Sequence, residues 1–285
     1  MPLGVPAIDA HLPDGGLRLA GLHEIAGARD EWDDAVAAGF CLALLGRLAA
    51  IRSQGAGPAP RGAILWAARR ADLYGPGVAG LMGPHQDQPA EPAKTEKTGG
   101  VLPGRLILVR ARRDDDVLWA LEEGLRAAGS GAVLSAVVGE VGEPDDTAMR
   151  RLQLAAEAAG RPCFLLRRRL FAGRAAALAS TPGSTHMSAP GSALTRWRVG
   201  ALPSKETRPS AEAGLAGGLT GLPGRARWRL ELLRCRGAAP GSFTVEWDDA
   251  AGDFALAAPV RDRPVAQGAG EVRTAAAVAA DRRAG

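Results

Sequence analysis

Cysteine is scarce in this sequence, which excludes several kinds of site at once. The 285 residues include three cysteines, Cys41, Cys163 and Cys235, which lie far apart and form no CxxC pair. A zinc site or a disulfide framework needs a closer or paired spacing, so neither is indicated. Cys41 and Cys163 sit inside apolar runs, and we interpret them as small core residues in a reduced compartment.

Targeting and membrane-spanning signals are also lacking. The segment Met1–Ala10 has no basic stretch followed by an apolar one, so no signal peptide is visible. The longest apolar run, Ala35–Leu45, is too short to span a bilayer and is soon followed by Arg47. The sequence therefore predicts a cytoplasmic protein without a membrane contact.

Aromatic residues and net charge are both low. Only 4% of the chain is aromatic although 46% is apolar, so alanine, leucine and valine must fill most of the core. The net charge of +4 is too small for a histone-like nucleic-acid binder. The charge is unevenly placed, however, because residues 161–236 contain 14 lysines and arginines against 3 acidic residues.

Segments with strand and helix periodicity alternate along the chain, which predicts the fold class. Strands are expected at Leu22–Ala26, Ala63–Ala67, Leu106–Arg110, Ala132–Val138 and Cys163–Leu166, and helices at Asp33–Ile51, Asp114–Ala128 and Asp146–Gly160. This alternation predicts an α/β fold with a mostly parallel sheet flanked by helices. Later segments favour C-terminal antiparallel strands, at Thr195–Ala201, Arg225–Cys235, Phe243–Trp247 and Asp253–Ala257.

Low-complexity stretches interrupt this pattern. We expect one core over residues 1–260, with disordered insertions near 84–104, 181–191 and 203–224, and a flexible C-terminal tail at 261–285. The insertions are rich in proline, glycine and polar residues, and the tail is rich in alanine and arginine.

A strand that leads through Gly27 into a long helix is the setting of a phosphate-binding loop, but the loop pattern is broken. In the pattern G-x-x-x-x-G-K-[ST] the second glycine is Trp32, the lysine is Asp33 and the serine or threonine is Asp34. Unit charges about 4 Å apart interact by roughly 4 kcal/mol at an effective dielectric near 20. An acidic residue in place of the lysine therefore repels phosphate, and we predict no nucleotide binding in the usual mode. The same residues are also explained by a plain acidic helix start, or by a divalent-metal site that lacks supporting ligands.

The start of the chain carries a resemblance that adds to this interpretation. The strings Leu-Gly-Val-Pro-Ala-Ile-Asp at Leu3–Asp9, Asp-Gly-Gly-Leu at Asp14–Leu17 and Gly-Leu-His-Glu-Ile at Gly21–Ile25 resemble the entry to a RecA-type core. Together with the element order, they make the chain similar to the ImuA family of bacterial RecA-like proteins over roughly residues 3–260.

The resemblance implies a role and a set of partners. RecA-type ATPases place a catalytic glutamate after the second core strand, where this chain has Ala68, and a metal-binding aspartate at the position of Gly139, one residue before Glu140. The implied function is that of a non-catalytic adaptor without cofactors in SOS-induced, error-prone translesion DNA synthesis. It would link ImuB, an inactive relative of lesion-bypass polymerases, and an error-prone replicative-type polymerase to RecA at damaged DNA. Two other functions stay open: a divergent ATPase that uses Glu140, and a SulA-like inhibitor of cell division.

Basic and aromatic residues supply the remaining expectations. The possible contacts for DNA or a partner are Arg167, Arg168 and Arg169, after the fifth strand, and Arg225, Arg227 and Arg229, on the exposed face of a later strand. Ordinary solvation of an arginine-rich surface is the alternative. Five tryptophans lie in apolar periodic contexts and are expected in the core: Trp32, Trp66, Trp119, Trp197 and Trp228. Trp32 is further expected to fill the vacant nucleotide pocket.

Overall fold

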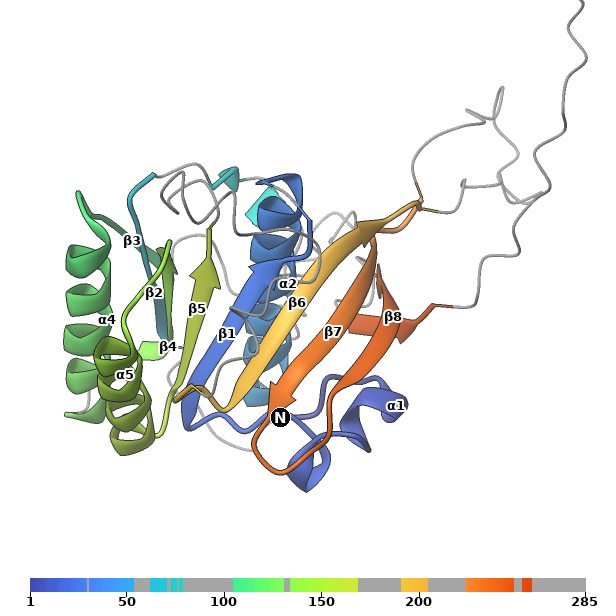
Figure 1. Ribbon diagram of the computed structural model, residues 1–285, viewed down its shortest axis with the longest axis horizontal. Helices are drawn as coiled ribbons and strands as arrows, with labels where there is room; N and C mark the ends of the chain where they lie inside the picture. The colour runs from blue at the N-terminus through green and yellow to red at the C-terminus, as the bar shows by residue number, and fades with distance from the viewer. Residues whose placement is uncertain are drawn as a thin grey trace, which may run out of the picture.

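One nine-stranded sheet, in the order β3-β2-β4-β5-β1-β6-β7-β8-β9, organises the chain (Figure 1). The computed structural model describes residues 1–29, 31–53, 62–70, 73–75, 77–78, 105–130, 134–168, 191–204, 224–248 and 253–257. The expected insertions and tail lie outside these ranges, apart from residues 191, 203–204 and 224.

Six neighbouring strands of the sheet run parallel. The alternation of elements predicts five of them, whereas the sixth, at Thr195–Leu202, was expected among the antiparallel strands but pairs parallel with Gly21–Gly27. The parallel strands are β1 (Gly21–Gly27), β2 (Ala63–Ala68), β3 (Leu106–Arg110), β4 (Leu134–Val141), β5 (Pro162–Arg167) and β6 (Thr195–Leu202). Antiparallel strands β7 (Arg227–Cys235), β8 (Gly241–Asp248) and β9 (Asp253–Leu256) then extend it from β6. The predicted fold class is confirmed.

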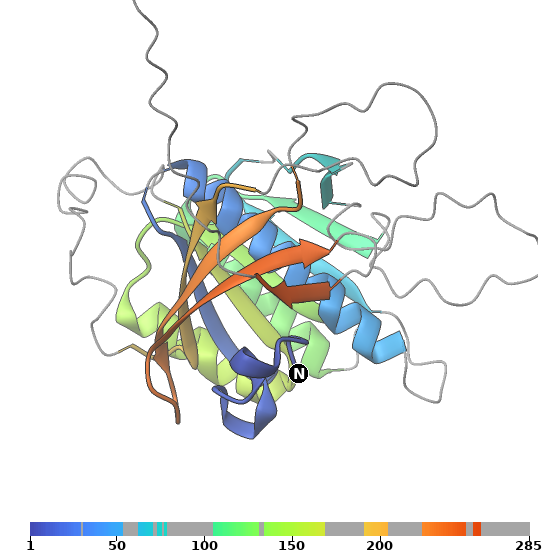
Figure 2. The ribbon, with the colours of Figure 1, turned by 90° about the vertical axis from the view of Figure 1, so that its right-hand side faces the viewer.

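Helices lie on both faces of the parallel half. The long helix α2 (Glu31–Ser53) packs on one face, and α4 (Asp114–Gly129) and α5 (Asp146–Ala159) pack on the other (Figure 2). The helix α5 begins where the Asp145 carboxylate accepts the Ala148 N–H at 2.6 Å. It ends at Gly160, whose φ of 62° is the left-handed conformation that glycine adopts without strain. The N-terminal segment adds the short α1 (Pro6–Asp9) and a 3-10 turn at Pro13–Gly15.

The core on the α2 side is aromatic where the antiparallel strands begin. Phe40 of α2 lies 5.9 Å from Trp197, 6.2 Å from Trp228 and 5.7 Å from Phe254, measured between ring centroids. Trp247 contacts Phe254 at 4.9 Å. Although aromatic residues are few, they are concentrated here. Their large rings let the single helix α2 contact residues of β6, β7 and β9 on this face of the sheet.

The structure corrects two expectations about burial and one about the length of an apolar run. Trp119 is 64% exposed on the outer side of α4 and does not belong to the core, whereas Trp66, Trp197 and Trp228 are buried as predicted. Arg227 is not on an exposed face, because its guanidinium is buried against Glu246. The apolar run in α2 is also longer than Ala35–Leu45: Trp32–Ile51 is long and apolar enough to cross a membrane, and 61% of it is buried inside the fold.

Candidate functional site

The candidate site lies where the parallel strands end, at the upper edge of the sheet in Figure 1. The chain leaves β1 there and enters α2, between the ends of β5 and β6. In sheets of this kind, ligands bind at the carboxyl ends of the strands, beside the strand where the order of connections reverses. The residues at the end of β1 therefore decide what this edge can bind.

The loop after β1 closes tightly on the start of α2. A Cβ atom built on Gly27 would lie 2.6 Å from the Asp33 carbonyl carbon and 2.7 Å from the Asp34 nitrogen, so no larger residue fits. The Ala28 N–H donates to the Val199 carbonyl at 2.9 Å, which ties the loop to β6. Gly27 thus allows the end of β1 to approach the backbone of Asp33 and Asp34 at the start of α2.

The carboxylate of Asp33 lies inside this loop and is 1% exposed. It accepts the backbone N–H of Arg29 at 2.9 Å and that of Ala201 at 3.0 Å. It also accepts two bonds from the Arg29 guanidinium, at 2.8 Å and 3.0 Å. Burial alone would raise the pKa of Asp33, but these hydrogen bonds outweigh it and hold the pKa below its usual value. A carboxylate of the chain itself therefore occupies the Arg29 amide of this loop and the Ala201 amide of β6.

The neighbours of Asp33 fall on opposite sides of the helix start. Asp34 is buried, and one of its carboxylate oxygens would lie 2.8 Å from a Cβ on Gly27. Trp32 is 78% exposed, so the expectation that it fills a nucleotide pocket, or lies in the core, is wrong. Its position in the first turn of an apolar helix looks like a core position in sequence, but the turn projects beyond the sheet.

The other two positions implied by the resemblance carry no carboxylate directed at this loop. Ala68 is buried, and its carbonyl accepts the Ala111 N–H at 3.0 Å. Gly139 faces α4, where a Cβ would lie 2.5 Å from the end of the Leu121 side chain, so an aspartate there would point into the packing against α4 and Leu121 would have to move.

Glu140, the next residue, points to the face of the sheet that α2 covers. It is fully buried, accepts the indole N–H of Trp66 at 2.8 Å and pairs with Arg168 at 3.4 Å. The buried carboxylate is thereby neutralised by a cation of the chain, as a buried charge requires.

A second buried ion cluster, not anticipated from the sequence, crosses the centre of the sheet. Glu24 of β1 is fully buried and pairs with Arg167 of β5 at 3.0 Å and with Arg196 of β6. Arg167 also donates to the Gly142 carbonyl at 2.8 Å. A glutamate within an apolar strand, with arginines in two later strands, was the available signal, but only the strand order shows that these three meet.

The arginines predicted as DNA or partner contacts are distributed over separate places. Arg167 and Arg168 are held in the two ion clusters, and Arg169 lies outside the described residues. Arg225 pairs with Asp248 at 2.9 Å and Arg227 with Glu246 at 3.0 Å, whereas Arg229 is exposed on β7. The strands β1 and β6 separate the two groups, so the structure does not bring these arginines into one patch.

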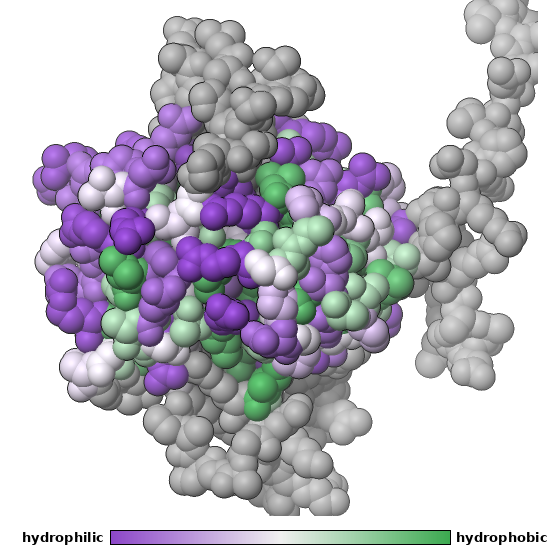
Figure 3. All heavy atoms as spheres, turned by 60° about the horizontal axis from the view of Figure 1, so that its bottom comes forward, coloured by the Kyte–Doolittle hydropathy of each residue, from purple (hydrophilic) through white to green (hydrophobic). Residues whose placement is uncertain are grey.

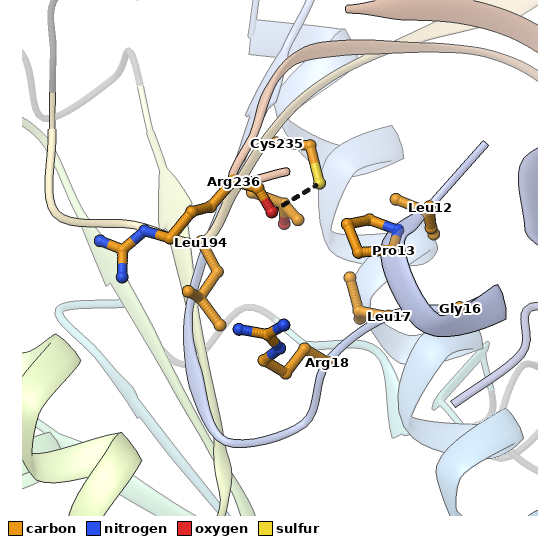
Figure 4. Close-up of a pocket in the computed structure, with 9 residues that line it drawn as sticks. Leu12, Pro13, Gly16, Leu17, Arg18, Leu194, Cys235 and Arg236 are labelled. Atoms are coloured by element: carbon orange, nitrogen blue, oxygen red, sulfur yellow. Dashed lines mark hydrogen bonds between the residues drawn. The ribbon is translucent and has the colours of Figure 1, made fainter. Parts of the chain in front are cut away.

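Neither a metal-ligand cluster nor a roomy cavity beside Cys235 is found among the described residues. Among them, no group of three or more His, Cys, Asp or Glu side chains is placed to hold a metal ion. A cavity at the opposite end of the sheet, between the N-terminal turn and Cys235, measures about 10 Å³ (Figure 4). Such a volume holds about one water molecule. Burial also raises the pKa of Cys235, which disfavours a thiolate there.

Comparison with known proteins gives one consistent result. The chain is 35% identical over 271 residues to the protein named "Protein ImuA" in two strains of Caulobacter vibrioides, NA1000 / CB15N and ATCC 19089 / CB 15. The match covers 93% of this chain and 92% of each relative. No family model matches the chain.

Proposed function

The chain belongs to the ImuA family, and from that premise we propose that it takes part in damage-induced mutagenesis as a non-catalytic, RecA-like adaptor. The observation that carries the non-catalytic part is the Asp33 carboxylate, which accepts the Arg29 and Ala201 amides inside the loop after β1. A phosphate group entering this loop would meet a negative charge where a phosphate-binding loop offers hydrogen-bond donors.

Two further positions support the same proposal. Ala68 has no proton acceptor in its side chain, so the place of a catalytic glutamate is empty. The charge of Glu140 is already balanced by Arg168 at 3.4 Å on the α2 side of the sheet, which disfavours its use as a magnesium ligand. Three independent changes would have to be reversed to restore ATP hydrolysis.

The proposed partners follow from the family premise and not from the contacts described above. The adaptor would connect an ImuB-like inactive polymerase and an error-prone replicative-type polymerase to RecA at damaged DNA. It would act in the cytoplasm without a cofactor or a membrane contact.

Calorimetric titration of the full chain with ATP and Mg²⁺, with phosphate release followed in parallel, tests the non-catalytic part. We expect neither binding nor turnover. The matched variant Asp33→Lys restores the lysine of the loop pattern but not the other two positions, so it is expected to remain without turnover. ATP binding by the wild-type chain at micromolar concentration would reject this part of the proposal and favour a divergent ATPase.

Complementation in cells tests the adaptor part. A strain that lacks the gene is expected to regain ultraviolet-induced mutagenesis with the wild-type chain and equally with Glu140→Gln, provided that this variant accumulates to wild-type levels. If Glu140→Gln is as stable as the wild type but does not restore mutagenesis, the carboxylate takes part in a reaction, which would contradict the adaptor proposal.

A further inference from the structure

The outer surfaces of α4 and α5 form an open groove on the side away from the sheet. Its volume is about 530 Å³, and its walls include Leu125 and Gly129 of α4 and Leu154, Ala155 and Ala158 of α5. Both helices lie at the end of the molecule opposite to the antiparallel strands (Figure 1). The groove is therefore separate from the loop at the end of β1.

The groove leaves apolar side chains exposed that the fold itself does not bury. Leu125 forms part of its floor and is 1% exposed, but Leu154 on the rim is 53% exposed. Figure 3 shows apolar side chains among hydrophilic ones over this end of the molecule. The small residues Gly129, Ala155 and Ala158 leave room for a backbone to approach closely.

An exposed tryptophan continues the same side of α4. Trp119 precedes Glu122 by three residues and Arg126 by seven, and this spacing places the three side chains on one face of the helix. The Trp119 side chain is 64% exposed. Tryptophan is enriched among the residues that contribute most of the binding energy in protein interfaces, so an exposed tryptophan on the helix that forms one groove wall points to a protein ligand.

The accessible charge at the rim is positive. Arg151 and Glu122 form an ion pair across the groove, but the arginine side chain is 61% exposed and the glutamate only 10%. Arg126, on the other wall, is 67% exposed, against 43% for its partner Glu123. A ligand in the groove therefore meets guanidinium groups that are more exposed than the carboxylates paired with them.

We propose that this groove binds an amphipathic helix of a partner protein, with an apolar stripe flanked by acidic residues. Binding of a helix in a groove uses apolar anchors at i, i+4 and i+7, which would contact Leu154 and Ala158 in the groove, with Trp119 one turn of α4 before the Glu122 end of the groove. The groove walls on α5 run from Arg151 to Ala159, which at 1.5 Å per residue is about 12 Å, or roughly two helical turns. The acidic flanks complement Arg126 and Arg151.

This inference rests on the proposed adaptor role only in that an adaptor needs a docking surface. The direct test is fluorescence anisotropy of the full chain with a labelled synthetic helical peptide of about 14 residues, with leucines at the three anchor positions and glutamates beside them. Two control peptides share its length: one has lysines in place of the glutamates, and the other has the same composition in shuffled order. We expect binding of the first peptide at micromolar concentration, and at least tenfold weaker binding of both controls.

Variants locate the binding. Leu154→Glu is expected to weaken binding at least tenfold, whereas Leu256→Glu, at a leucine of 58% exposure on the distant strand β9, is expected to leave it unchanged. Arg126→Glu is expected to shift the preference from the acidic to the basic peptide. Both leucine positions are exposed, so the variants should fold, and circular dichroism checks this.

Four outcomes would overturn the inference. Equal binding of the shuffled peptide would show nonspecific attraction, and unchanged binding by Leu154→Glu would place the peptide elsewhere. Concentration-dependent dimerisation that Leu154→Glu abolishes would show that a second copy of this chain occupies the groove. If peptide binding fails while complementation of mutagenesis succeeds, the groove is rejected and the proposed function stands. The converse result rejects the function and retains the groove.

Discussion

His23 offers the sharpest test of the packing around β1, because its buried ring is expected to make folding depend on pH. The ring is fully buried beside Phe164, with Nδ1 2.8 Å from the Thr195 hydroxyl and Nε2 2.8 Å from the Arg18 carbonyl. The Thr195 oxygen also accepts the indole N–H of Trp197 at 3.0 Å, so its own proton is free to bond Nδ1. This arrangement fits a neutral ring with its proton on Nε2.

The magnitude follows from the shift in pKa. Burial lowers the pKa of His23 from 6.5 to about 4, although the bond to the Arg18 carbonyl partly opposes this. Between these values the unfolded chain binds a proton that the folded chain does not, so stability falls as the pH falls from 6.5 towards 4. At about 1.36 kcal/mol per unit, the loss approaches about 3 kcal/mol, of which about 2 kcal/mol is reached by pH 5.

The assay is urea unfolding of the wild type and of His23→Gln between pH 8 and pH 5. The variant is expected to be less stable at pH 8, because glutamine cannot reproduce both ring hydrogen bonds, but to lack the extra loss on acidification. The difference in unfolding free energy between the two proteins should therefore shrink by about 2 kcal/mol over this range. A constant difference would refute the assignment of a buried neutral ring.

Three further predictions concern single side chains. Asp33→Ala is expected to lower the unfolding free energy by about 2 kcal/mol in urea, because the Arg29 and Ala201 amides lose their acceptor; an unchanged midpoint would show that water replaces the carboxylate. Glu24→Gln should cost about 3 kcal/mol by leaving Arg196 buried without its counter-charge, and the same thermal unfolding curve as wild type would contradict this. Trp32→Ala should stay within about 0.5 kcal/mol of wild type while Trp66→Ala costs about 3 kcal/mol or more, and similar losses for both would refute the exposure of Trp32.

Local patterns in the sequence were sufficient to predict most of the elements. The periodicity of a strand or a helix is a property of consecutive residues. The strand at Leu106–Arg110 and the helix that ends at Gly160 could therefore be placed without knowledge of the other elements. Exposure was predicted less well, because it depends on what covers an element. Trp119 occupies an apolar stretch of α4, yet it lies on the helix face that no described element covers.

The candidate site shows the same limit more strongly. The broken phosphate loop could be recognised from Gly27 to Asp34 because its residues are adjacent in sequence. The acceptor role of Asp33 toward Ala201 could not, because 168 residues separate the two and only the pairing of β1 with β6 brings them together. Arginines were predicted as surface contacts from local charge and from their positions relative to the strands, whereas Arg167 pairs with the buried Glu24 and Arg227 pairs with Glu246, both on other strands.

The carboxylate inside the loop after β1 has a consequence for how this fold responds to the state of the cell. A phosphate loop that must bind an anion is stabilised by its ligand in proportion to the logarithm of ligand concentration. Here the anion is the Asp33 carboxylate, which is covalently part of the chain. Its effective concentration is therefore fixed, and the loop is stabilised without a ligand. Under the proposed role, the melting temperature and the shape of this edge would be the same at high and at low ATP concentration.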